Sequence, residues 1–173
     1  MKHVLASIVA AFFSFSSALQ AQSANPMSSE LKAAYDSVKA NLLRAAEKMP
    51  DENYGFKPTP DIRSFAQVLD HAASAQMHTC GAVLGEQKPV NAEAATKADV
   101  VAALNAAFAE CDKAYDSLTD ANAAEMIKTP RGGRSRIGAL AGNIAHDNEQ
   151  YGILSVYMRL KGVSPSDSPS RAK

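Results

Sequence analysis

A run of five polar residues, from His146 to Gln150, lies in the middle of a segment that is otherwise patterned for burial. The run interrupts two stripes of heptad spacing, which are Ile137, Leu140, Ile144, Asp147, Tyr151, Leu154, Met158 and Ala139, Asn143, His146, Gln150, Ile153, Tyr157, Leu160. A helix with two such faces is buried on more than one side. Buried polar side chains are costly unless they have partners, so the run needs a hydrogen-bond network or a bound metal ion.

Four segments with a helical period position this run. They extend from about 29 to 48, from Ser64 to Gly85, from Thr96 to Leu118, and from Ser135 to about Lys161. Two of the predicted helices begin with a capping box, in which the first residue and the residue three positions later each accept a hydrogen bond from the other's backbone amide through their side chains. The pairs are Ser64 with Gln67, and Thr96 with Asp99. The elements that would carry chemistry are therefore helices.

The connecting segments show no alternation of period 2, so we expect no strand. Residues 49–63 contain three Pro and one Gly and indicate a loop. Residues 86–95 are long for a helical hairpin and allow a crossover with the two middle helices parallel. Residues 119–126 predict a short helical turn and residues 128–134 a loop. The predicted fold class is an all-α four-helix bundle.

Composition excludes some partners. The chain has 18 Lys+Arg and 18 Asp+Glu among 173 residues, so it carries no net charge with which to bind nucleic acid. Its length and its 46% of hydrophobic residues suit one folded domain. We therefore expect a small molecule, and not a nucleic acid, as the partner, with a homodimer as a further expectation.

The first 21 residues are typical of a secretory signal peptide. A short positive start precedes an apolar run from Val4 to Leu19, and Ala21 ends a small-residue cleavage pattern. We expect a folded domain over 22–162, a disordered tail over 163–173, and no stable membrane span after cleavage. The expected location is periplasmic or secreted, an oxidising environment.

Cys80 and Cys111 are the only cysteines. If the two middle helices are parallel, both residues lie about fifteen positions from the start of their helices and at a similar level, as a disulfide requires. The alternative is a pair of buried thiols that act as small hydrophobic residues.

Three stretches carry a resemblance to a known family: SFAQVLDHAASAQ, HDNEQYGILSVYMRLKGVSPS and YGFKPTP. Together they resemble the DinB family of damage-inducible, metal-site proteins. The resemblance implies an up-down-down-up bundle in which one His of the second helix and two His at i, i+4 on the fourth bind a divalent ion, zinc or nickel. The implied metal ligands are His71 and His146, with Gln150 in place of the third His.

The replacement at Gln150 changes the expected chemistry. Three neutral imidazoles and a water form an open zinc site that lowers the pKa of the water to about 7, whereas an amide oxygen is a poorer zinc ligand. Asp147 and Glu149 lie off the His146 face by about 100° per residue. His78 lies two helical turns, about 10 Å, from His71, so it cannot share one ion with it.

Two functions remain open at this point. The resemblance implies a metal-dependent hydrolase or a thiol transferase in which the third ligand is degraded. The alternative is a non-catalytic bundle that binds a small ligand or a partner without metal, with His71, His146 and Gln150 as a buried hydrogen-bonded network. Gln150 is the residue that discriminates between them.

Overall fold

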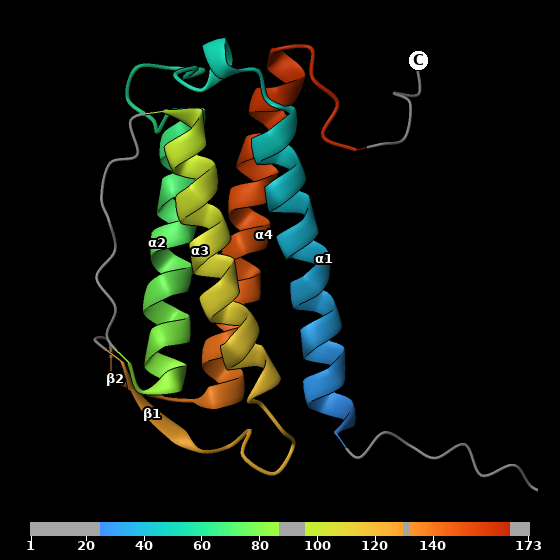
Figure 1. Ribbon diagram of the computed structural model, residues 1–173, viewed down its shortest axis with the longest axis vertical. Helices are drawn as coiled ribbons and strands as arrows, with labels where there is room; N and C mark the ends of the chain where they lie inside the picture. The colour runs from blue at the N-terminus through green and yellow to red at the C-terminus, as the bar shows by residue number, and fades with distance from the viewer. Residues whose placement is uncertain (1–24, 87–95, 130–131, 167–173) are drawn as a thin grey trace, which may run out of the picture.

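Four long helices arranged up-down-down-up make up the protein, as a computed structural model shows for residues 25–86, 96–129 and 132–166 (Figure 1). The elements in chain order are α1 (Pro26–Lys48), the 3-10 helix η1 (Asp51–Asn53), α2 (Phe65–Leu84), α3 (Lys97–Asp116), β1 (Met126–Thr129), β2 (Gly132–Ser135) and α4 (Arg136–Leu160). Because α2 and α3 both run downward in Figure 1, the two middle helices are parallel, as predicted. The all-α four-helix bundle is confirmed.

The starts and the end of the middle helices follow from local chemistry. The Ser64 side chain accepts a hydrogen bond from the Gln67 amide while the Gln67 side chain accepts one from the Ser64 amide. Thr96 and Asp99 form the same reciprocal pair ahead of α3. Gly85 ends α2 with φ of 76°, a left-handed conformation that glycine adopts without steric cost. Both predicted capping boxes are therefore present.

The start of α1 depends on a residue far away in the sequence. The helix begins at Pro26, three residues before the predicted start. Its first amides, those of Met27 and Ser28, donate to the Asp120 carboxylate at 3.1 and 2.8 Å. Asp120 lies in the turn after α3 and places a negative charge at the positive end of the α1 dipole. Helix α1 is therefore capped by tertiary structure.

The prediction that the chain has no strand is wrong. Strands β1 and β2 pair antiparallel, with Met126 opposite Ser135 and Thr129 opposite Gly132. Each strand has four residues, too few to show a period of 2 in the sequence. The helical turn predicted over 119–126 is also absent, since Thr119 and Asn122 instead accept successive turn hydrogen bonds. Of the loop predicted over 128–134, the described residues 128–129 and 132–134 thus belong to the two strands, and β2 leads directly into α4.

A disulfide joins the two parallel helices. Cys80 of α2 and Cys111 of α3 form the bond with their Cα atoms 5.0 Å apart. Both side chains are fully buried, within a core that takes residues from all four helices. The bridge is therefore the alternative that the structure shows, and it fixes the height of α2 against α3.

The ends of the chain bear on the remaining predictions. The predicted signal peptide, most of the connection 86–95 and the tail residues 167–173 lie outside the described residues. The first part of the predicted tail, 163–166, packs on the bundle: the Val163 amide donates to the Met158 carbonyl, and Pro165 is buried. Among the residues that the structure describes, no helix is long and apolar enough to span a membrane.

Candidate metal centre

Helices α2 and α4 bring His71 and His146 together. Their Nε2 atoms lie 3.1 Å apart, and the rings meet edge to face with centroids 5.0 Å apart. Each ring is partly exposed. The two residues are 75 positions apart in the chain, so the contact is a product of the bundle and not of local sequence. Two of the three predicted ligands are thus in position to share one ion.

The third predicted ligand, Gln150, lies one helical turn beyond His146 on α4. Its side chain is 4% exposed, and its Oε1 atom has no hydrogen-bond partner among the described residues. A buried amide oxygen without a donor is an unmet acceptor, and a cation or an N–H group can satisfy it. This observation fits the proposed position of Gln150 in a ligand set.

Asp147 lies on the other buried stripe of α4, as the heptad spacing predicted, and it nevertheless contacts His146. It is fully buried, and its Oδ1 atom lies 3.6 Å from Nδ1 of His146, while Oδ2 accepts a hydrogen bond from Asn143 at 3.3 Å. Because α4 is buried on two sides, a residue 100° away from His146 still faces the interior. Burial raises the pKa of Asp147, and His146 opposes this effect.

The position of Asp147 favours one form of His146. A carboxylate near Nδ1 favours the tautomer that carries its proton on Nδ1, which leaves the Nε2 lone pair directed at His71. The 3.6 Å separation is longer than a hydrogen bond, so the contact is electrostatic. Sequence reasoning did not indicate this contact between Asp147 and His146.

The electrostatics of His71 are set by burial and by four neighbouring residues. Burial, the positive charge of Arg63 and the nearby His146 ring lower the pKa of His71, and Glu149 and Asp70 raise it by less. An imidazole held neutral in this way is the form that binds a metal ion. The net effect of burial and these neighbours therefore favours the neutral form of His71, which can act as a metal ligand or as a hydrogen-bond partner.

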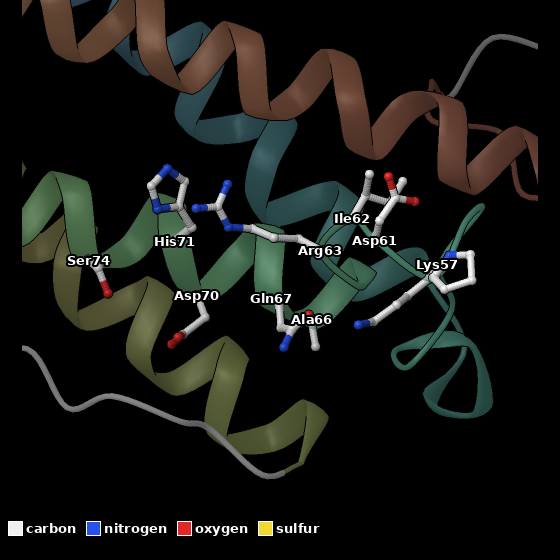
Figure 2. Close-up of a pocket in the computed structure, with 10 residues that line it drawn as sticks. Lys57, Asp61, Ile62, Arg63, Ala66, Gln67, Asp70, His71 and Ser74 are labelled. Carbon is white, nitrogen blue, oxygen red and sulfur yellow. The ribbon is translucent and has the colours of Figure 1, made fainter.

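A cavity of 670 Å³ opens beside His71. It is lined by the loop before α2 and by the first turns of α2, and Figure 2 shows Arg63 extending toward His71 while Asp70 projects from the other side of the helix. Small-molecule sites in proteins have volumes of about 300–1,000 Å³. The histidine pair therefore lies at the edge of a space large enough for a small ligand.

The two histidines fit a shared ion in geometry. Zinc lies about 2.0–2.1 Å from imidazole nitrogens, so two ligands in a tetrahedral set lie about 3.3 Å apart, close to the 3.1 Å observed. The donor set as a whole fits zinc less well than a set of three strong ligands would. Residues 25–86, 96–129 and 132–166 contain no group of three His, Cys, Asp or Glu arranged to hold a metal. His78, which lies two helical turns beyond His71, is exposed.

The sequence as a whole matches one family model. The model describes the DinB superfamily and matches residues 34–154, more than half of the chain. The chain belongs to the DinB superfamily. No protein with a curated description matches the sequence.

Solved structures share the fold of this DinB superfamily chain. A DinB-like protein from Bacillus cereus has a TM-score of 0.67 at 14% identity, over 82% of this chain and 97% of that one. A DinB-like protein from Bacillus subtilis has a TM-score of 0.63 at 15% identity, over 81% and 95%. A conserved protein from Enterococcus faecalis has a TM-score of 0.63 at 15% identity, over 78% and 96%. The bundle is therefore shared although most of the sequence is not.

Proposed function

We propose that this protein binds a divalent transition-metal ion, zinc or nickel, between α2 and α4, with His71 and His146 as its principal ligands and Gln150 as a weak third. The observation that carries the proposal is the 3.1 Å approach of the two Nε2 atoms at the edge of a cavity. Such an ion supplies Lewis acidity for metal-dependent hydrolysis or for thiol transfer on a small molecule.

The chain's own residues have separate roles in this proposal. The neutral state of His71 leaves its lone pair available, and Asp147 favours the His146 tautomer whose Nε2 can act as a ligand. The buried Gln150 oxygen contributes an uncharged donor. Because an amide oxygen is a poorer zinc ligand than an imidazole, the affinity is expected to be low compared with a three-histidine site.

The test is a zinc titration by calorimetry on the wild type and on Gln150→His. Residue 150 lies one turn from His146 on the same buried side, so the new imidazole completes the three-histidine set. We expect zinc affinity to rise by at least about tenfold and the melting temperature with zinc to rise, because the ion binds only the folded chain. His71→Ala in the Gln150→His background should remove the gain.

His78→Ala is the matched control, since His78 is an exposed histidine on the same helix as His71. Its zinc affinity should equal that of the wild type. Equal affinity of the wild type and Gln150→His would show that position 150 does not face the ion. A wild type that binds no zinc or nickel would contradict the proposal itself.

A second candidate is a small-ligand-binding bundle without metal. The observation that favours it is the same 3.1 Å separation, which is also the length of a hydrogen bond between two neutral imidazoles. In this case the pair fixes α2 against α4, and the cavity binds a ligand without chemistry. Absence of metal binding together with ligand-induced stabilisation would favour this candidate over the first.

A further inference from the structure

Arg63 is held beside the histidine pair by its backbone. Its carbonyl oxygen accepts a hydrogen bond of 3.0 Å from the hydroxyl of Tyr157 on α4, and the residue directly precedes the Ser64 cap of α2. The loop is further tied to α2 where the Phe65 amide donates to the Phe56 carbonyl. The base of the Arg63 side chain is therefore fixed, and Figure 2 shows the side chain extending along the cavity toward His71.

The guanidinium group of Arg63 is not paired with an acidic side chain of any residue that the structure describes. Within the described part of the chain, neither Arg63 nor Lys57, the other basic residue of the cavity wall, forms an ion pair with an acidic side chain. Two acidic residues also line the cavity. Asp61 is engaged by Thr59 and its own backbone, and Asp70 projects away from the side on which Arg63 lies.

The positive charge beside the histidine pair favours the binding of an anion. Arg63 and His71 both line the cavity, and Figure 2 shows the Arg63 side chain extending toward His71. A divalent ion on the uncharged donors His71, His146 and Gln150 would add to this positive field without any protein ligand to neutralise it. A planar guanidinium binds a carboxylate or a phosphate through two parallel hydrogen bonds.

We propose that Arg63, assisted by Lys57, binds the oxyanion group of a small-molecule ligand in the cavity beside His71 and His146. The substrate class of this site is thus a small molecule that carries a carboxylate or a phosphate. The inference rests on the proposed function for the reaction of that molecule, whereas the binding of the oxyanion itself is measured without metal.

The experiment follows backbone amide signals by NMR while metal-free protein is titrated with succinate and, separately, with inorganic phosphate. The variants are Arg63→Gln, Arg63→Lys and Arg134→Gln. Arg134 is the matched control, because its guanidinium donates to the Gly138 carbonyl at the opposite, hairpin end of the bundle. Arg63→Gln and Arg134→Gln remove the same charge, so a difference between them locates the site.

We expect one or both anions to shift the amides of residues 63–67, with Arg63→Gln about tenfold weaker or more, Arg63→Lys intermediate and Arg134→Gln within about twofold of the wild type. Binding of one anion only would identify its class. Equal binding by Arg63→Gln and Arg134→Gln, or no shift with either anion, would overturn the inference. Zinc binding without anion binding would leave the proposed function standing, and the converse would leave only this inference.

Discussion

Polar side chains are hydrogen-bonded in the contact between α1 and α3, whereas several buried polar atoms lack a hydrogen-bond partner in the contact between α2 and α4, among the residues that the structure describes. Between α1 and α3, the Asp112 carboxylate accepts hydrogen bonds from Lys39 at 2.6 and 2.7 Å and from the Tyr35 hydroxyl at 2.8 Å. By contrast, all the buried side-chain atoms without a hydrogen-bond partner in the described residues belong to α2 and α4: Gln76, Arg136, Asn143, His146, Asp147 and Gln150.

The difference separates a structural contact from a candidate functional one. Each unmet buried polar group opposes folding, so a helix pair that retains several of them is under a constraint other than stability. The α1–α3 contact supplies cohesion, while the α2–α4 contact holds the histidine pair and its buried neighbours. Four changes in the chain can break or sharpen this contrast.

The largest effect is expected from the disulfide that ties α2 to α3. Replacement of Cys80 and Cys111 by Ala should lower the free energy of unfolding by about 3–4 kcal/mol, because a bridge over 31 residues restricts the unfolded chain. Thermal melts of the oxidised wild type and of the variant measure the loss. Alkylation of both thiols in the wild type without prior reduction would show that the bridge is absent.

Asp112→Ala should have the next largest effect, because it removes the acceptor of the α1–α3 network. We expect a loss of about 1–2 kcal/mol, reduced by the partial exposure of the ion pair. Burial opposes ionisation of Asp112, but Lys39 and Tyr35 outweigh it and lower its pKa. The wild-type advantage is therefore present at neutral pH and declines as pH falls below the ordinary Asp value of about 3.9. Urea unfolding of the wild type and the variant measures their difference in the free energy of unfolding at pH 7 and at pH 3. A difference that is the same at both pH values would contradict this account.

Asp147→Asn should have the opposite sign. Its carboxylate is buried without a full partner and has a raised pKa, so wild-type stability declines as pH rises above the ordinary Asp value. We expect the variant to be more stable by about 1 kcal/mol at pH 7 and equal to the wild type near pH 3. Glu149→Gln, at an exposed neighbour, is the control and should change little. If the Asp147→Asn variant is less stable than the wild type at pH 7, the Asp147 carboxylate stabilises the fold, as Asp112 does between α1 and α3.

The smallest effect is expected from Tyr157→Phe. The change removes the hydrogen bond that holds the Arg63 carbonyl to α4, with a loss of about 0.5–1 kcal/mol. Chemical denaturation measures this loss, and amide exchange at residues 63–65 should accelerate. Tyr151→Phe, whose hydroxyl makes a longer 3.4 Å contact with the Pro165 carbonyl, is the control. Equal losses in both variants would remove the special role of the Arg63 anchor.

Much of the fold could be predicted because the helix signals are local. The Ser64 and Thr96 capping boxes act within four residues, and the matched levels of Cys80 and Cys111 follow once α2 and α3 are parallel. The hairpin could not be predicted, since four residues per strand give too little alternation. The start of α1 was missed because Asp120, which caps it, is more than 90 residues away.

The candidate site was predictable in part. The resemblance to the family indicated His71 and His146, and the structure places their Nε2 atoms together. The heptad stripes indicated that Asp147 is buried, but they could not show that its Oδ1 atom lies 3.6 Å from Nδ1 of His146. Arg63 gives no periodic signal, since it lies in the loop before α2, and only the tertiary contact of Tyr157 reveals where its side chain starts.

The direction of α1 also determines which attachment point on the chain lies far from the cavity when the protein is fixed to a surface or joined to a fusion partner. Its 23 residues span about 34 Å, from the hairpin end at Pro26 to the end that bears the cavity. The carbonyl oxygen of Ser166 accepts from Lys48 at that second end. A tag placed immediately before Pro26 therefore stands a whole helix length from the end that bears the cavity, whereas one placed after Ser166 starts at that end.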